Sequence, residues 1–142
     1  MALIPTQTTL TIGGRVFTDL ANLIVLYAGP GINSKSTFRT AGGSSGYTPS
    51  GSKTFVCAAW RANIAAGTSI QIGYTDNDVG LQSAGSFTNF VQPGHGIPSF
   101  YAAGALENVE QILTDFTVPN GKYLSLDGGG ANLIIQVFGY EV

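Results

Sequence analysis

Short segments of alternating or apolar character dominate this chain, and they are separated by turns rich in glycine, proline, asparagine, aspartate and serine. The clearest is Thr68–Tyr74, in which small or polar residues alternate with Ile70, Ile72 and Tyr74. A period of two places successive side chains on opposite faces of a strand. The segment therefore predicts a strand with one face toward the core and one toward solvent.

Similar segments recur along the chain, separated by turn residues. The expected strands are Leu10–Ile12, Arg15–Thr18, Ala21–Tyr27, Lys35–Thr40, Lys53–Asn63, Thr68–Tyr74, Ser86–Val91, Phe116–Val118, Lys122–Leu126 and Ala131–Val142. Short strands with turns roughly every 8–12 residues are typical of sandwiches and jelly rolls. At 142 residues the chain fits one domain. We therefore predict an all-β, single-domain β-sandwich or jelly roll of about 8–10 short strands.

Ala102–Leu113 is the one stretch compatible with a helix. Its acidic and aliphatic residues suit one, whereas Gly104 and Asn108 weaken it. The alternative is a strand over Glu110–Thr117, and the sequence leaves both interpretations open.

The proportion of charged residues is unusually low, at 10%, against roughly 25% in ordinary globular domains. Disorder does not explain it, because the chain contains eight Phe, six Tyr and one Trp. No run of about 18 apolar residues is present, so we expect no membrane partner. A surface of Gly, Ser, Thr, Asn and Gln can be buried against neighbours without stranding charges. The composition therefore favours a protein that assembles.

Basic residues are few and scattered along the sequence, and the formal net charge is −2. They are Arg15, Lys35, Arg39, Lys53, Arg61 and Lys122. Nucleic-acid binding requires a basic patch. We therefore expect no nucleic-acid partner.

The single cysteine, Cys57, lies in an apolar run and cannot form an intramolecular disulfide. We interpret it as a small buried hydrophobic residue rather than a reactive thiol. Met1–Pro5 shows no basic region followed by a long apolar region, so no secretory signal is visible. Together these features predict a chain that is made and folded in a cytoplasm.

Reactive side chains are almost absent. The only histidine, His95, lies between two glycines, and no second histidine can join it in a zinc site. The spacing Gly-x-Ser-x-Gly occurs only at Gly42–Gly46, within a Gly/Ser-rich segment that we interpret as a flexible loop rather than as a nucleophile turn between a strand and a helix. Glu107 and Asp127 show no evident partner for glycosidase chemistry. We predict that the protein is not an enzyme and has no catalytic, cofactor-binding or metal site.

Asp76–Gly80 (Asp-Asn-Asp-Val-Gly) begins like a calcium-binding loop. The match is short, and the distal bidentate glutamate of such loops is missing. Turns in which Asp and Asn side chains bond to nearby backbone amides explain the same residues. We favour the turn over the metal site.

Two turns resemble each other: Thr48–Val56 and Val118–Ser125 both contain Pro-x-Gly followed by Lys and an aromatic-led strand. Proline presets the φ angle of such a turn and glycine accepts a positive φ. Internal duplication and recurrent turn chemistry remain alternative explanations.

The last expected strand is apolar on both faces. Leu133, Ile135, Val137 and Gly139 share one face, and Ile134, Gln136, Phe138 and Tyr140 share the other. One face would meet the core, and the other a second sheet or a second subunit. Exposed strand edges must be paired, covered or charged, and lysines stand only at the first position of expected strands rather than along them. We therefore name Leu133, Ile135, Val137, Phe138 and Tyr140 as candidate subunit contacts, as in a three-fold ring.

Leu10–Tyr27, Ile70–Gly80 and Phe116–Val142, with the Val-Pro-x-Gly-Lys-Tyr motif at Val118–Tyr123, resemble the small capsid decoration (cement) proteins of tailed bacteriophages. They are also similar to the jelly-roll heads of phage fibres. The resemblance covers most of the chain and lies in its texture rather than in a diagnostic motif.

The resemblance implies a homotrimeric jelly roll that binds the major capsid protein on the outer surface of the virion and stabilises the shell. The family has no catalytic residues to carry over. Its N-terminal arm corresponds to residues 1–11, and residues 12–142 to the single β-sandwich domain. Leu3, Ile4, Pro5 and Thr6 are then the expected capsid contacts.

The alternative is a receptor-binding or glycan-binding fibre head. Trp60, Tyr47, Tyr74 and Tyr101 are the aromatic residues that would stack on a sugar. However, Trp60 lies in an apolar strand, and we expect it in the core.

Overall fold

The computed structural model describes residues 8–29, 35–64, 69–80, 86–91, 99–101, 107–128 and 133–142. Every regular element within these residues is a β-strand, which confirms the all-β prediction. The strands are β1 (Leu10–Ile12), β2 (Arg15–Phe17), β3 (Ile24–Ala28), β4 (Lys35–Thr37), β5 (Arg39–Thr40), β6 (Phe55–Ile64), β7 (Ser69–Thr75), β8 (Ser99–Tyr101), β9 (Glu107–Val118), β10 (Tyr123–Gly128) and β11 (Ile134–Glu141).

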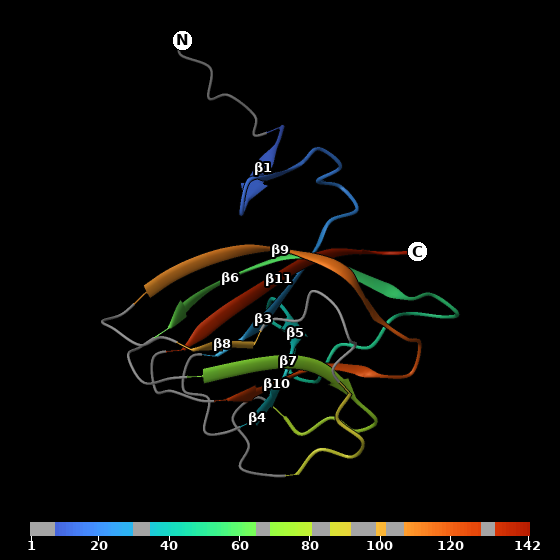
Figure 1. The fold of residues 1–142 in the computed structure, drawn as a ribbon. Helices are drawn as coiled ribbons and strands as arrows, with labels where there is room; N and C mark the ends of the chain where they lie inside the picture. Colours follow the sequence, from blue (N-terminus) through green and yellow to red (C-terminus); the bar gives the residue numbers. More distant parts are fainter. Residues whose placement is uncertain are drawn as a thin grey trace.

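Three antiparallel sheets are formed. The first is the five-stranded sheet β5-β3-β11-β6-β9, the second the four-stranded sheet β4-β10-β7-β8, and the third the hairpin β1-β2. Figure 1 shows the two larger sheets as separate layers, with the hairpin above the five-stranded sheet.

Strand pairs are nested about the β7–β8 connection. β7 pairs with β8, β6 with β9, β4 with β10 and β3 with β11. The chain therefore runs out along one side of a long antiparallel ribbon and returns along the other. Two further pairings, β11 with β6 and β10 with β7, join segments of the ribbon into the two sheets.

One hydrophobic cluster takes buried side chains from both larger sheets. Its largest member, Trp60, has no exposed surface, and Cys57 is 1% exposed beside it. The predictions that Trp60 is a core residue and that Cys57 is a buried small hydrophobic residue are therefore confirmed. Burial also raises the pKa of the Cys57 thiol well above its ordinary value.

The side chains of β11 alternate between its two faces as the sequence predicts. However, the inner-face residues contact the domain's own core rather than a second subunit. Leu133, Ile135 and Val137 are at most 1% exposed, in the cluster between the two sheets. As subunit contacts these three are wrong, because a core side chain cannot reach another molecule without unfolding the domain.

The opposite face of β11 is covered by the chain itself. Ile12 and Phe17 of the hairpin pack with Phe138, and Tyr140 lies against the same group. Phe138 is only 2% exposed. The second layer on this face, which the sequence analysis left to a sheet or a subunit, is therefore largely the β1-β2 hairpin.

The hairpin packs on β6 at a β-bulge. Phe138 lies opposite Ala59 and Gly139 lies opposite Cys57, so Ala58 is an extra residue in β6. Ala58 and Ala59 both belong to the hairpin cluster. Two small adjacent side chains leave room above the sheet, and Ile12 and Phe17 fill it.

Three further expectations change. Ala102–Leu113 is not a helix where the structure describes it, because Glu107–Val118 is strand β9, whose residues 107–112 and 116–118 pair with β6. Residues 102–106 lie outside the described residues.

Ser86–Val91 is not a strand and makes one isolated bridge, between Val91 and Tyr74. The boundary between residues 11 and 12 divides β1, so the hairpin belongs with the domain.

The described residues include no helix long and apolar enough to cross a membrane.

The attachment of the hairpin leads to a first prediction. Phe17→Ala removes a buried ring that contacts Phe138 and Tyr140, and should lower the free energy of unfolding by about 3 kcal/mol. Val16→Ala, on the same hairpin but with Val16 56% exposed, should cost less than about 1 kcal/mol. Urea unfolding measures both, and equal losses would contradict the packing described.

Candidate functional site

Three connections gather at one end of the molecule: residues 41–54, the described parts of 76–91, and 119–122. They come from distant parts of the sequence, yet hydrogen bonds tie them together. We call this region the loop end.

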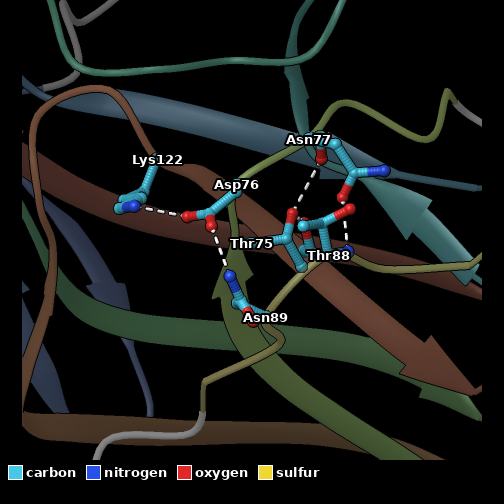
Figure 2. A network of polar contacts seen from close by, with 7 residues as sticks. Thr75, Asp76, Asn77, Thr88, Asn89 and Lys122 are labelled. Atoms are coloured by element: carbon cyan, nitrogen blue, oxygen red, sulfur yellow. Dashed lines mark hydrogen bonds and ion pairs between the residues drawn. The ribbon is translucent and has the colours of Figure 1, made fainter.

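Asp76 is the centre of the first tie, which Figure 2 shows. One carboxylate oxygen forms an ion pair with the ammonium of Lys122, and the other accepts a hydrogen bond of 2.7 Å from Nδ2 of Asn89. These hydrogen bonds lower the pKa of Asp76 below its ordinary value. The first residue after β7 thus connects the 86–91 segment to the β9–β10 turn.

Asn77 extends this tie to the same segment. Its Oδ1 accepts a hydrogen bond of 2.7 Å from the amide of Thr88, and its Nδ2 donates one of 3.2 Å to the carbonyl of Ser86. The side chain therefore replaces a backbone partner for both residues. Figure 2 shows Asn77 beside Thr88, with Asp76 directed to the other side.

Asp78 makes the turn that the sequence favoured over a calcium loop. Its Oδ1 accepts a 2.8 Å hydrogen bond from the amide of Gly80, two residues on, which confirms the turn interpretation. Its Oδ2 accepts a 2.7 Å bond from the amide of Gly46 in a different connection. Both oxygens of this carboxylate bind backbone amides of the chain.

The described parts of the 76–91 connection also cover a polar layer on the outer face of the four-stranded sheet. Thr37, Thr75 and Ser125 are fully buried there. Thr75 and Ser125 share a hydrogen bond of 3.1 Å, and the amide of Val79 donates one of 3.0 Å to Oγ1 of Thr37. Because these hydroxyls have partners, their burial carries little penalty.

Aromatic side chains cover the same face next to this polar layer. Phe87 and Phe90 stack with ring centroids 4.9 Å apart, and Lys35 lies 5.6 Å from the centre of the Phe87 ring. A Cβ atom on Gly73 would collide with Phe90 and with the backbone of Val91. Glycine at this position in β7 therefore lets the connection lie directly on the sheet.

Glu141, at the end of β11, ties the C-terminal strand to the loop end. It accepts hydrogen bonds from the hydroxyl of Tyr47 at 2.5 Å and from the hydroxyl of Ser50 at 2.6 Å. The bonds from Ser50 and Tyr47 lower the pKa of Glu141. Burial, followed by the bond to Glu141, raises the pKa of Tyr47.

The two similar Pro-x-Gly turns meet at this end. Nδ2 of Asn120 donates to the carbonyl of Pro49 at 3.1 Å and to the carbonyl of Gly51. Gly51 and Gly121 both have the positive φ that such turns require. The two motifs therefore contact each other directly, whichever explanation of their likeness holds.

A row of side chains crosses the outer face of the five-stranded sheet beside the hairpin. Arg39 lies opposite Tyr27, Tyr27 opposite Gln136, and Gln136 opposite Arg61. Directly opposite residues in antiparallel strands share a face, so all four are on the outer face. We call them the Arg–Tyr row.

Arg61 is held in place within the Arg–Tyr row. Its Nε donates to Oε1 of Gln136, and its guanidinium lies 5.3 Å from the centre of the Phe138 ring. Beyond the row, Ile134 is 42% exposed. A shallow pocket of about 370 Å³ lies between Ile134, Tyr27 and Arg39.

The other predicted sites have the following positions. Leu3, Ile4, Pro5, Thr6 and His95 lie outside the described residues. Trp60 is buried, and Tyr47 and Tyr74 are partly buried against the core, so these aromatics do not form one sugar-stacking surface. In the part of the chain that the structure describes, no three His, Cys, Asp or Glu side chains converge as metal ligands.

Sequence reasoning missed the Arg–Tyr row. Its members come from positions 27, 39, 61 and 136, and only the strand register brings them together. The available signal was the position of Tyr27, Arg61 and Gln136 within expected strands, which placed them on a sheet without identifying their neighbours.

Comparison with known proteins found no matching family model, no similar curated protein and no similar solved structure. Functional inference for this chain therefore depends on its own residues and geometry.

The turn at Asp78 gives a second prediction. Asp78→Ala removes both backbone partners of this side chain and should lower the free energy of unfolding by about 1 kcal/mol. Asp78→Asn keeps one oxygen acceptor and should lose less. Thermal or urea unfolding measures both, with and without added Ca²⁺. Stabilisation of the wild type by Ca²⁺ that Asp78→Ala abolishes would instead support a metal loop.

Acid sensitivity provides a third prediction. Asp76 and Glu141 have folded-state pKa values below their ordinary values of 3.8 and 4.5. Their contribution to stability is therefore complete above those ordinary values and is lost as the pH falls through the lowered folded-state values. Glu141→Gln should flatten the decline in unfolding free energy below about pH 4.5. An unchanged acid dependence would contradict this role for Glu141.

Proposed function

We propose that this protein is a structural subunit that decorates the outer surface of a viral capsid and stabilises the shell. The observation that carries the proposal is the use of the described carboxylates. Asp76, Asp78 and Glu141 each bond to a segment that is distant in sequence. Because these carboxylates hold separate segments together, they make the domain stiffer. Stiffness suits a protein whose task is mechanical rather than catalytic.

The strand arrangement supports the finer fold assignment within this proposal. Without the hairpin and the short β5, the described residues form eight strands, arranged as β3-β11-β6-β9 and β4-β10-β7-β8. Two four-stranded sheets with nested pairs are the pattern of a jelly roll, a fold used by viral capsid and lectin domains. We therefore interpret the two-layered domain as a jelly-roll β-sandwich.

The choice of a capsid as the binding partner rests on the sequence resemblance to phage decoration proteins. In this proposal the protein forms a homotrimer, binds the major capsid protein through its N-terminal segment and has no enzymatic activity. Many modest contacts, repeated over a lattice, would add to a large stabilisation of the shell.

A second candidate function is glycan or receptor recognition by a fibre head. A pocket of about 620 Å³ beside Tyr140 favours it, lined in part by Asp19, Asn22 and Lys53. Carboxylate, amide and ammonium groups beside an aromatic ring are a suitable set for a polar ligand. The shallow form of the pocket and the burial of Trp60 make this the weaker candidate.

Rebinding distinguishes the two functions and gives a fourth prediction. The purified protein, added to capsids stripped of their decoration protein, should bind at saturable stoichiometry and raise the temperature at which they release DNA. A variant lacking residues 1–7 should bind less. Binding to a glycan array together with unchanged capsid stability would instead support the fibre head.

A further inference from the structure

The turn between β9 and β10 contains Asn120–Gly121, the only Asn-Gly pair in the sequence. The turn is closed by a hydrogen bond of 3.1 Å from the amide of Lys122 to the carbonyl of Pro119, and Gly121 has a φ of 80°. Asn-Gly is the residue pair most prone to deamidation, because glycine has no side chain to shield its amide nitrogen from the asparagine carboxamide. Asn120 is exposed to solvent, so this turn places a reactive pair within reach of water.

The carboxamide of Asn120 is held by the partner turn at the loop end. Its Nδ2 donates to the carbonyl of Pro49 at 3.1 Å and to the carbonyl of Gly51. A carboxamide nitrogen carries two N–H donors, and both are therefore used. While these bonds persist, the carboxamide cannot rotate freely toward the backbone nitrogen of Gly121.

Deamidation of this pair needs only water. The backbone nitrogen of Gly121 attacks Cγ of Asn120 and forms a C–N bond, while its proton passes to the leaving nitrogen. The Cγ–Nδ2 bond then breaks and ammonia departs, which leaves a cyclic imide. Water adds to either carbonyl of the imide and opens the ring, giving an aspartate or an isoaspartate.

The product cannot restore the contact between the two turns. A carboxylate has only acceptors where the carboxamide had two donors, and it would face the carbonyl oxygens of Pro49 and Gly51. Both carbonyls would lose their partner, and the new negative charge would repel them. Deamidation at Asn120 therefore releases the β9–β10 turn from the 49–51 turn.

From these observations we infer that Asn120–Gly121 is a self-modification site controlled by the contact between the two Pro-x-Gly turns. The pair is protected while the turns are in contact, and it reacts when local opening of the loop end separates them. Because the product cannot rebind, each such event loosens the loop end permanently. The inference goes beyond the proposed function and does not depend on what the protein binds.

Peptide mapping by mass spectrometry tests the control of the reaction. The full-length protein is incubated at mildly alkaline pH, and conversion of Asn120 is followed over time in the wild type and in Ser50→Ala. Ser50 donates a hydrogen bond of 2.6 Å to Glu141, so this variant loosens the partner turn and leaves Asn120 itself unchanged. Conversion should be about fivefold faster in Ser50→Ala, the factor expected when opening no longer breaks one such hydrogen bond.

Two comparisons separate local opening from other causes. Phe17→Ala weakens the packing of the hairpin, which lies outside the loop end, and should leave the conversion rate at Asn120 unchanged while the protein stays folded. Asn22 is also exposed but is followed by a leucine, and it should convert more slowly than Asn120 in every variant.

The consequence of the reaction is tested with the product's own charge. Asn120→Asp should lower the melting temperature by about 4 °C. Asn120→Ser, which gives this turn the central residue of the partner turn, removes the donors without adding a charge and should lower it less.

Four outcomes would overturn the inference. They are conversion at Asn120 no faster than at Asn22, equal conversion rates in the wild type and Ser50→Ala, equal acceleration by Phe17→Ala and Ser50→Ala, and a melting temperature of Asn120→Asp equal to that of the wild type. The third would show that the reaction follows global unfolding rather than opening of the loop end.

Discussion

Strand β6 is the element on which the other layers of this protein depend. It pairs with β11 on one side and with β9 on the other, and thereby joins the two halves of the nested ribbon within one sheet. On its inner face Trp60 and Phe55 occupy the core. On its outer face the bulge at Ala58 and the neighbouring Ala59 make the seat for the hairpin. One strand thus sets the sheet, the core and the position of the third layer.

Charged side chains are few in this protein, and several of those described perform a structural task. Asp76 and Lys122 hold a loop to a turn, Asp78 joins two connections, and Glu141 secures the C-terminal strand. In an exposed setting a single ion pair contributes little stability, but hydrogen bonds that order separate loops limit each other's motion. The loop end is therefore a connected unit.

The outer faces of both larger sheets are covered in part by the chain's own segments. The hairpin lies on the five-stranded sheet, and the 76–91 connection lies on the four-stranded sheet. This arrangement explains how a chain with so little charge conceals its apolar strands without requiring a partner for each face. The outer face beside the hairpin carries the Arg–Tyr row.

The sequence by itself determined the fold class, most strand positions and the core character of Cys57 and Trp60, because these follow from local periodicity and hydrophobicity. It also determined the turn at Asp78, since an Asp and the amide two residues later interact locally. It did not predict β8, and over the first half of β9 it left a helix and a strand from Glu110 as alternatives, because helix-compatible residues obscured the alternation there. Only the tertiary structure decided what covers Phe138, which side chains meet in the Arg–Tyr row and which strands form edges. Those features depend on register between strands as far apart as residues 27 and 136, and pairing over such distances is decided by the folded chain as a whole rather than by any local segment.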